Sequence, residues 1–238
     1  LMVSPPEYPS CLGENSEGDS MFTLGRMSFD MYEPSDLVCS IQKQYNTIKS
    51  VDPKDLPLYV PKSLRREVDN ERRGNCSGRL KTYNIIASFT IEDTAENSSR
   101  DAIRAQSKKP LRGIITSYGY ALPDPTLSDR KSIWFTGGTI EPADDDSIDE
   151  WMKIFGSNSV DIIAKEEAST GHDTNESRST VEAEKAKTLA FKILLGAVHE
   201  PINNQGTVGF HLNKPIGGHG SAYCDIVYMD DELRIMRE

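Results

Sequence analysis

Residues 79–92, "RLKTYNIIASFTIE", carry the clearest structural signal in the chain. The apolar side chains in this stretch fall on every second position, and polar side chains fall between them. The apolar set is Tyr83, Ile85, Ala87, Phe89 and Ile91, and the polar set is Asn84, Ser88, Thr90 and Glu92. Successive side chains of a strand point to opposite faces. The stretch therefore predicts a β-strand with one buried face.

Similar alternation recurs along the chain and predicts about eight strands. The further candidates are 27–31, 37–45, 111–122, 131–141, 207–212 and the two arms of 222–237. In 27–31, Met27, Phe29 and Met31 share one face, and in 37–45 Gln44 is expected on the polar face. The pair Gly137 and Gly138 predicts a bulge or sharp bend.

Two helices are expected between these strands. Ser147 with Glu150, and Ser179 with Glu182, match the pattern in which a serine caps a helix and a glutamate follows three residues later. The acidic run 144–146 precedes the first helix, and negative charge is favourable at a helix N-terminus. We prefer this interpretation to a calcium-binding loop, because the alternating oxygen ligands and the final glutamate of such a loop are missing.

The fold class that follows is mainly β. Antiparallel strands with one apolar face bury it in a closed barrel or a sandwich, and a barrel of this size is either filled or holds one small ligand. We expect a disordered segment at 1–20 and one domain at 21–238. Polar insertions are expected at about 49–78, 93–109 and 156–180, because their composition is too polar to build a core.

Composition narrows the function classes. The net charge of −10 disfavours nucleic acid, whose phosphates repel an acidic chain. None of the four cysteines forms a CxxC pair, and Cys39 and Cys224 are expected as buried apolar side chains. No nucleophile, phosphate-loop or metalloprotease motif occurs. We therefore expect a non-enzyme without metal or cofactor.

The C-terminal stretch "SAYCDIVYMDDELRIMRE", 221–238, reads as a hairpin that turns on Asp230 and Asp231. Cys224, Ile226 and Tyr228 are expected to point inward, with Asp225 outward. On the return strand, Arg237 is expected on the inward face.

This hairpin resembles the C-terminal signature of the plastid lipid-associated protein (PAP)/fibrillin family. The matching residues are Tyr228, Asp230, Asp231, Glu232, Leu233, Arg234, Ile235 and Arg237. The segments "MSFDMYEPSDLVCSIQ", "SIWFTGGTIE" and "KPIGGHG" are similar to others of that family. The family usually begins with a helix and a Trp-bearing strand, neither of which is seen here, and it continues with a further strand after the arginine.

The resemblance implies a lipocalin-like barrel with its last strand missing. It also implies binding or organisation of a hydrophobic plastid molecule, such as a prenylquinone, carotenoid or fatty acid, at thylakoids or plastoglobules. Candidate cavity residues are Met27, Phe29, Tyr83, Phe89, Phe135, Ile226, Tyr228 and Arg237. Two alternatives stay open: a filled barrel that serves as a structural or interaction protein on lipid bodies or photosynthetic complexes, and a lipid-acting enzyme.

Overall fold

The computed structural model describes residues 11–57, 60–73, 80–92, 110–156, 190, 192–229 and 234–237. It is mainly β. The strands are β1 Gly13–Glu14, β2 Ser20–Thr23, β3 Val38–Thr47, β4 Lys81–Thr82, β5 Asn84–Ile91, β6 Arg112–Pro123, β7 Arg130–Pro142, β8 Ala197–His199, β9 Val208–Gly217, β10 Tyr223–Met229 and β11 Arg234–Arg237. The helices are α1 Leu24–Met27, η1 Pro53–Asp55, α2 Lys62–Arg73, η3 Asp145–Ser147 and α4 Ile148–Phe155.

All the strands belong to one antiparallel sheet. Its main path runs β1-β2-β3-β5-β6-β7-β10-β11, while β4 pairs with β6 and β9 joins β7 to β8. The long strand β7 offers its second edge to two partners, first to β10 and then to β9. Within the described residues no pairing joins β8 or β11 back to β1, β2 or β3, so the sheet does not close and the expected barrel is not confirmed.

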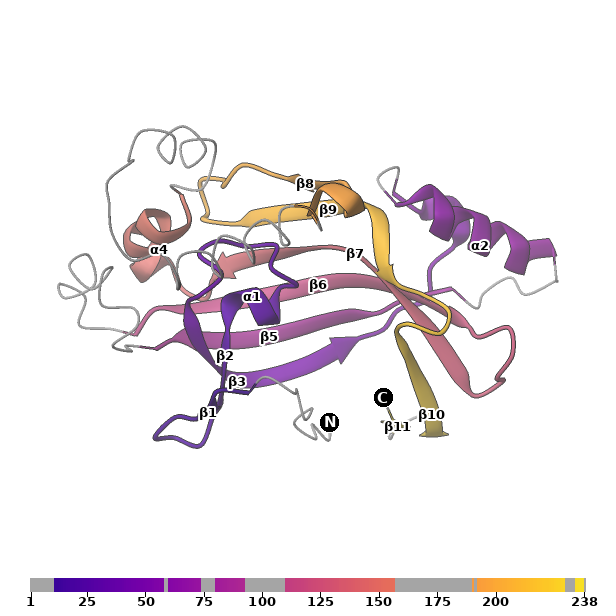
Figure 1. The fold of residues 1–238 in the computed structure, drawn as a ribbon, viewed down its shortest axis with the longest axis horizontal. Helices are drawn as coiled ribbons and strands as arrows, with labels where there is room; N and C mark the ends of the chain where they lie inside the picture. Colours follow the sequence, from indigo (N-terminus) through magenta and orange to yellow (C-terminus); the bar gives the residue numbers. More distant parts are fainter. Residues whose placement is uncertain are drawn as a thin grey trace, which may run out of the picture.

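In a closed barrel the apolar face of the sheet would be buried inside. Here α1, the loop that follows it and α4 cover that face instead. In Figure 1 α1 lies across β5 and β6, and α4 lies at the end of the sheet where β6 begins. The core on this face includes Leu24, Met31, Tyr32, Leu37, Cys39, Ala87, Phe89, Ile91, Leu111, Ile115, Ile140, Trp151, Phe155, Leu195, Phe210 and Leu212. Gly113 makes this packing close, because a Cβ there would overlap the rings of Phe89 and Trp151.

Helix α2 occupies the stretch that the sequence predicted as a polar insertion. Its buried side chains Leu64 and Val68 pack with Leu122 and Trp134, which lie on the opposite face of the sheet from Ile115. Four apolar residues spaced along 56–68 supply this second small core, although the surrounding composition is strongly polar. Figure 1 shows α2 beside the end of the β6–β7 hairpin.

Most predicted strands are confirmed, and so is the bulge. Thr136 is skipped between Phe135 and Gly137 when β7 pairs with its neighbours. The predicted helix after Ser147 is also confirmed, but the Ser147 hydroxyl donates to Asp144 instead of capping the helix. Cys39 and Cys224 are buried as expected.

The other predicted helix lies mostly outside the described residues, of which 190 and 192–195 are helical. The insertions at 93–109 and 157–180 also lie outside them. Residues 11–20, which were expected to be disordered, contain β1 and a turn in which the Asn15 side chain accepts from the backbone N–H groups of Glu17 and Asp19.

The predicted strand at 27–31 is wrong. Residues 24–27 form the single turn of α1, and Phe29 and Asp30 follow with positive φ angles of 54° and 57°. The Thr23 hydroxyl accepts from the N–H of Arg26 at 3.3 Å and so caps this turn. Alternation over only five residues does not distinguish a strand from a helical turn followed by a tight loop.

The two arms of the C-terminal hairpin pair antiparallel as predicted, from Asp225 with Arg237 to Met229 with Arg234. The predicted turn at Asp230 and Asp231 lies outside the described residues. Asp225 points outward as expected, but it is half-buried. Its carboxylate receives two hydrogen bonds from Arg130, at 2.7 and 3.0 Å. This ion pair ties β10 to β7.

Candidate binding site

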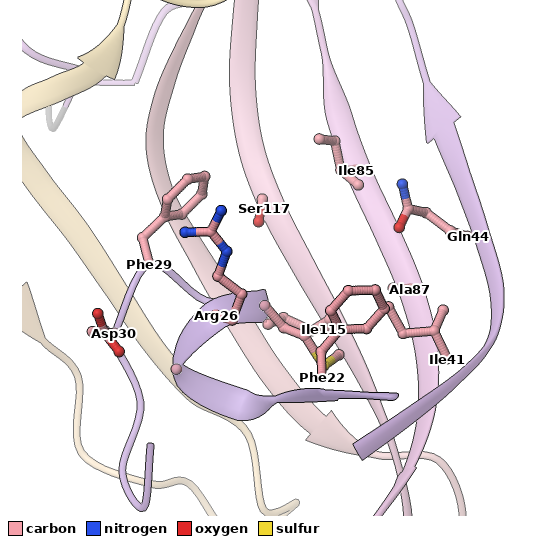
Figure 2. Close-up of a pocket in the computed structure, with 12 residues that line it drawn as sticks. Phe22, Arg26, Phe29, Asp30, Ile41, Gln44, Ile85, Ala87, Ile115 and Ser117 are labelled. Atoms are coloured by element: carbon pink, nitrogen blue, oxygen red, sulfur yellow. The ribbon is translucent and has the colours of Figure 1, made fainter. Parts of the chain in front are cut away.

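A pocket of about 220 Å³ lies between α1 and the strands β3, β5 and β6. Its lining is Phe22, Gly25, Arg26, Met27, Phe29, Asp30, Ile41, Gln44, Ile85, Ala87, Ile115 and Ser117. Figure 2 shows side chains from the strands and from the α1 segment converging on this space. Most of the lining is apolar, and a few polar side chains are set among it. This is the usual composition of a site for a small organic molecule.

The strand pairing explains the apolar floor. Ala87 of β5 lies opposite Ile115 of β6, and Ile85 lies opposite Ser117. Because side chains at alternate positions share a face, these four residues point to the same side of the sheet. Ile41 of β3 pairs with Phe89 and extends this side by one strand.

A bulge in β3 brings a polar side chain into the floor. Ile41 pairs with Phe89 and Lys43 with Ser88, so Gln42 has no partner in the ladder. One extra residue reverses which positions face inward. Gln44 therefore lies opposite Ala87 and lines the pocket, whereas simple alternation placed Gln44 on the polar face.

The α1 segment forms the other wall. The N–H of Asp30 donates to the carbonyl of Gly25 at 2.7 Å, which folds the chain tightly back over the helical turn. A Cβ at position 25 would overlap the Asp30 carboxylate and Ser35, so this close approach requires glycine. The fold-back places Met27 and Phe29 at the pocket, and Phe29 is 40% exposed.

Three polar groups at the pocket are free to meet a ligand. The side chains of Arg26, Gln44 and Ser117 form no hydrogen bond or ion pair with any other residue in the described part of the chain. Figure 2 shows the Arg26 guanidinium extending toward the strands, between Phe29 and Ser117. Asp30 lies apart from them, with its carboxylate over Gly25.

The structure brings together only part of the predicted cavity. Met27 and Phe29 line the pocket. The ring of Phe135 lies beside it and contacts that of Phe29, with 5.8 Å between the ring centres. Phe89 is fully buried against Trp151 in the core beneath, and the buried Tyr83 hydroxyl accepts a hydrogen bond from Asn46. The side chains of Ile226, Tyr228 and Arg237 lie outside the described residues.

Sequence reasoning missed the polar groups and much of the floor. Arg26 gave no signal, because it lies just before the predicted strand 27–31 and belongs to no motif. Gln44 was assigned to the wrong face by the unforeseen bulge. Ile85 and Ala87 were on the predicted inward face, but no pattern distinguishes a residue that lines a pocket from one that fills a core.

A second polar cluster lies at the base of the β6–β7 hairpin, near α2. The Ser132 hydroxyl is hydrogen-bonded to Asp124 at 2.9 Å and to Nδ1 of His219 at 2.8 Å. The other imidazole nitrogen of His219, Nε2, lies 3.5 Å from the Glu67 carboxylate of α2. His219 also packs edge-on against Trp134.

The cluster contains Ser, His and Asp but not in a catalytic arrangement. A nucleophilic serine needs an exposed hydroxyl, and its histidine is oriented by the carboxylate. Here Ser132 is fully buried and stands between the carboxylate and the imidazole. Hydrogen bonds from Thr126, Ser132 and Leu127 hold the pKa of the Asp124 carboxyl well below its usual range. This is the pattern of a structural network that fixes the hairpin.

Comparisons with known proteins give no relatives: no family model, curated protein or solved structure matches the chain. Among the described residues no helix is both long and apolar enough to cross a membrane. The same residues contain no cluster of three or more His, Cys, Asp or Glu side chains suited to a metal ion.

Proposed function

We propose that this protein binds a hydrophobic small molecule, without catalysis, in the pocket between α1 and the sheet. The observation that carries the proposal is the pocket itself: an apolar floor from three strands, covered by a segment whose aromatic residue Phe29 stays 40% exposed. Burial of apolar ligand surface supplies about 25 cal/mol per Å² before the costs of association.

The volume limits what fits. About 220 Å³ lies below the roughly 300–1,000 Å³ of sites that enclose a drug-sized molecule. A ring, or the first eight or so atoms of a chain, fits this space. A whole carotenoid does not, so a long ligand leaves most of its body outside the pocket.

A site of this size implies modest affinity for the part it encloses. At roughly 0.6 kcal/mol for each of about eight buried atoms, binding contributes about 5 kcal/mol, which corresponds to a dissociation constant near 0.2 mM. Contacts outside the pocket add to this for a longer molecule.

The biological setting rests on the resemblance of the C-terminal hairpin to the PAP/fibrillin family. We propose accordingly that the ligand is a plastid lipid and that the protein acts at thylakoids or plastoglobules, as an open-sheet counterpart of a lipocalin-like barrel. A structural role on lipid bodies or photosynthetic complexes is the alternative. The exposed apolar side chains of Ile193 and Leu194, 70% and 62% exposed, favour a contact surface of that kind.

A pair of neighbouring substitutions tests the binding function. Ser117→Phe places a ring in the pocket, whereas Thr116→Phe places the same ring on the opposite, partly exposed face of β6. Saturation-transfer NMR measures contact of 1-octanol and octanoate with each protein. We expect at least one of the two ligands to bind the parent and Thr116→Phe, and neither to bind Ser117→Phe. Equal binding by both variants would place the ligand elsewhere, and no binding by the parent would end the proposal.

A further inference from the structure

The pocket contains one cationic side chain whose charge is not neutralised by the described residues. Arg26 lines the pocket and makes no ion pair or side-chain hydrogen bond with any of them. Two other arginines in the same residues have carboxylate partners: Arg130 pairs with Asp225 at 2.7 Å, and Arg112 pairs with Asp144 at 3.4 Å. A guanidinium offers five donors in a planar fork that matches a carboxylate.

The surroundings of Arg26 favour a ligand partner over water alone. Its guanidinium extends toward the strands, between the ring of Phe29 and Ser117. The apolar floor of Ile85 and Ile115 lies beyond these residues and can bury the apolar chain of a ligand whose head group meets Arg26. Ser117 and Gln44 add a hydroxyl and an amide that can donate to the same oxygen atoms.

The nearby acid does not cancel this charge. Asp30 also lines the pocket, but its carboxylate lies over Gly25 and forms no ion pair with Arg26. Figure 2 places Asp30 on the side of α1 away from the strands, whereas the Arg26 guanidinium reaches over them. The Arg26 guanidinium, and not the Asp30 carboxylate, therefore lies on the side of the strands that form the pocket floor.

We infer that the pocket selects an amphiphile with one apolar chain and a carboxylate head, which Arg26 binds with the help of Ser117 and Gln44. This inference rests on the proposed binding function and narrows it. Within the proposed ligand classes it favours a fatty acid and disfavours prenylquinones and carotenoids, which carry no negative charge for Arg26 to bind.

Three ligands with the same chain length separate charge from apolar burial. Octanoate, 1-octanol and octylammonium each carry eight carbons, which match the pocket volume, and their head groups are negative, neutral and positive. Isothermal titration at low ionic strength gives a dissociation constant for each. We expect the parent to bind octanoate about tenfold tighter than 1-octanol, the factor of one charge-assisted hydrogen-bonded pair, and octylammonium weakest.

Four variants identify the charge responsible. Arg26→Met keeps most of the side-chain bulk without the charge and is expected to reduce octanoate affinity about tenfold, leaving 1-octanol within twofold of the parent. Arg26→Lys is expected to retain part of the preference, since it keeps the charge but not the planar fork. Asp30→Asn is expected to tighten octanoate two- to threefold. Arg66→Met on α2, an exposed arginine that does not line the pocket, is the matched control and is expected to change nothing.

The outcomes test the binding function and the head-group inference separately. If the parent binds 1-octanol as tightly as octanoate, the head-group inference is overturned and the binding function stands. If octanoate is preferred but Arg26→Met keeps that preference, Arg26 is not the anion-binding group and the inference is likewise overturned. If the parent binds none of the three ligands, both fall together. Arg26 is exposed, so equal melting temperatures of parent and Arg26→Met are expected and verify that the variant is folded.

Discussion

The same substitution at two buried tyrosines should have opposite effects on stability. Tyr32 and Tyr83 are 3% and 1% exposed, so each side chain is enclosed by the core. The Tyr83 hydroxyl accepts a hydrogen bond from Asn46 at 2.8 Å. The Tyr32 hydroxyl has no hydrogen-bond partner in the described part of the chain, and its ring packs edge-on against Phe210, 5.4 Å between centres.

The expected magnitudes follow from what each hydroxyl does. A buried hydroxyl without a partner costs about 1–3 kcal/mol, so Tyr32→Phe should raise the free energy of unfolding by about 1 kcal/mol. Loss of one hydrogen bond costs about 1 kcal/mol, so Tyr83→Phe should lower it by that amount. With a urea slope of about 2–3 kcal/mol per M, the two midpoints should differ by about 0.7–1 M.

The two variants should also differ in alkaline solution. Burial raises the pKa of the Tyr32 phenol far above its usual range, and the nearby Tyr118 and Glu200 raise it further. A group whose folded-state pKa is raised contributes stability below its unfolded-state pKa, about 10 for tyrosine, and loses it as the pH rises beyond that value. The loss is about 1.4 kcal/mol per pH unit above 10. Tyr32→Phe removes this loss.

Urea unfolding followed by circular dichroism at pH 8 and pH 11 measures both effects. We expect Tyr32→Phe to be more stable than the parent at pH 8, and we expect the difference in the free energy of unfolding to be larger at pH 11. Tyr83→Phe should be less stable than the parent at pH 8. If both variants are destabilised equally at pH 8, the Tyr32 hydroxyl has a partner and the reasoning is refuted.

Three further substitutions test the packing and the polar contacts. Gly113→Ala should destabilise the protein by about 1–3 kcal/mol in urea melts, because the added methyl overlaps two aromatic rings in the core; an unchanged midpoint would show that the rings move freely. Asp124→Asn should destabilise the protein at pH 7 and less so at pH 3. Hydrogen bonds lower the pKa of this carboxyl, so the stability contributed by the carboxylate is lost as the pH falls toward that lowered value. Equal destabilisation at both pH values would contradict this. Arg130→Met should increase amide hydrogen exchange in β10 relative to β5, because it removes both hydrogen bonds to Asp225 and the stacking on Tyr223, 3.6 Å from the ring centre; unchanged exchange would show that β10 does not depend on this pair.

The long strands could be predicted from the sequence because apolar and polar side chains alternate over many residues in each of them. The stretch 79–92 and the pair 111–122 and 131–141 each present a sustained apolar face, and β5, β6 and β7 follow these limits closely. The paired glycines also marked the bulge at Thr136 correctly. Closure of the sheet was not predictable, because alternation reports which face is buried and not which edges pair.

The pocket depends on two local events that leave weak sequence signals. The turn at α1 was read as a strand, since its apolar residues also fall on alternate positions over 27–31. The bulge at Gln42 has no glycine to mark it, yet it turns Gln44 inward. Helix α2 was missed because polar residues dominate its sequence, and its apolar residues Leu64 and Val68 pack against the sheet.

Methyl-resolved NMR of isoleucine tests the central claim most directly, because the chain places isoleucines both at the pocket and away from it. Ile41, Ile85 and Ile115 line the pocket, whereas Ile86 of β5 and Ile114 of β6 lie on the opposite face of the sheet. With saturating octanoate, we expect nuclear Overhauser contacts from ligand protons to the first three methyl groups and none to the other two. Contacts confined to other isoleucines, or none to any, would contradict a binding site between α1 and the sheet.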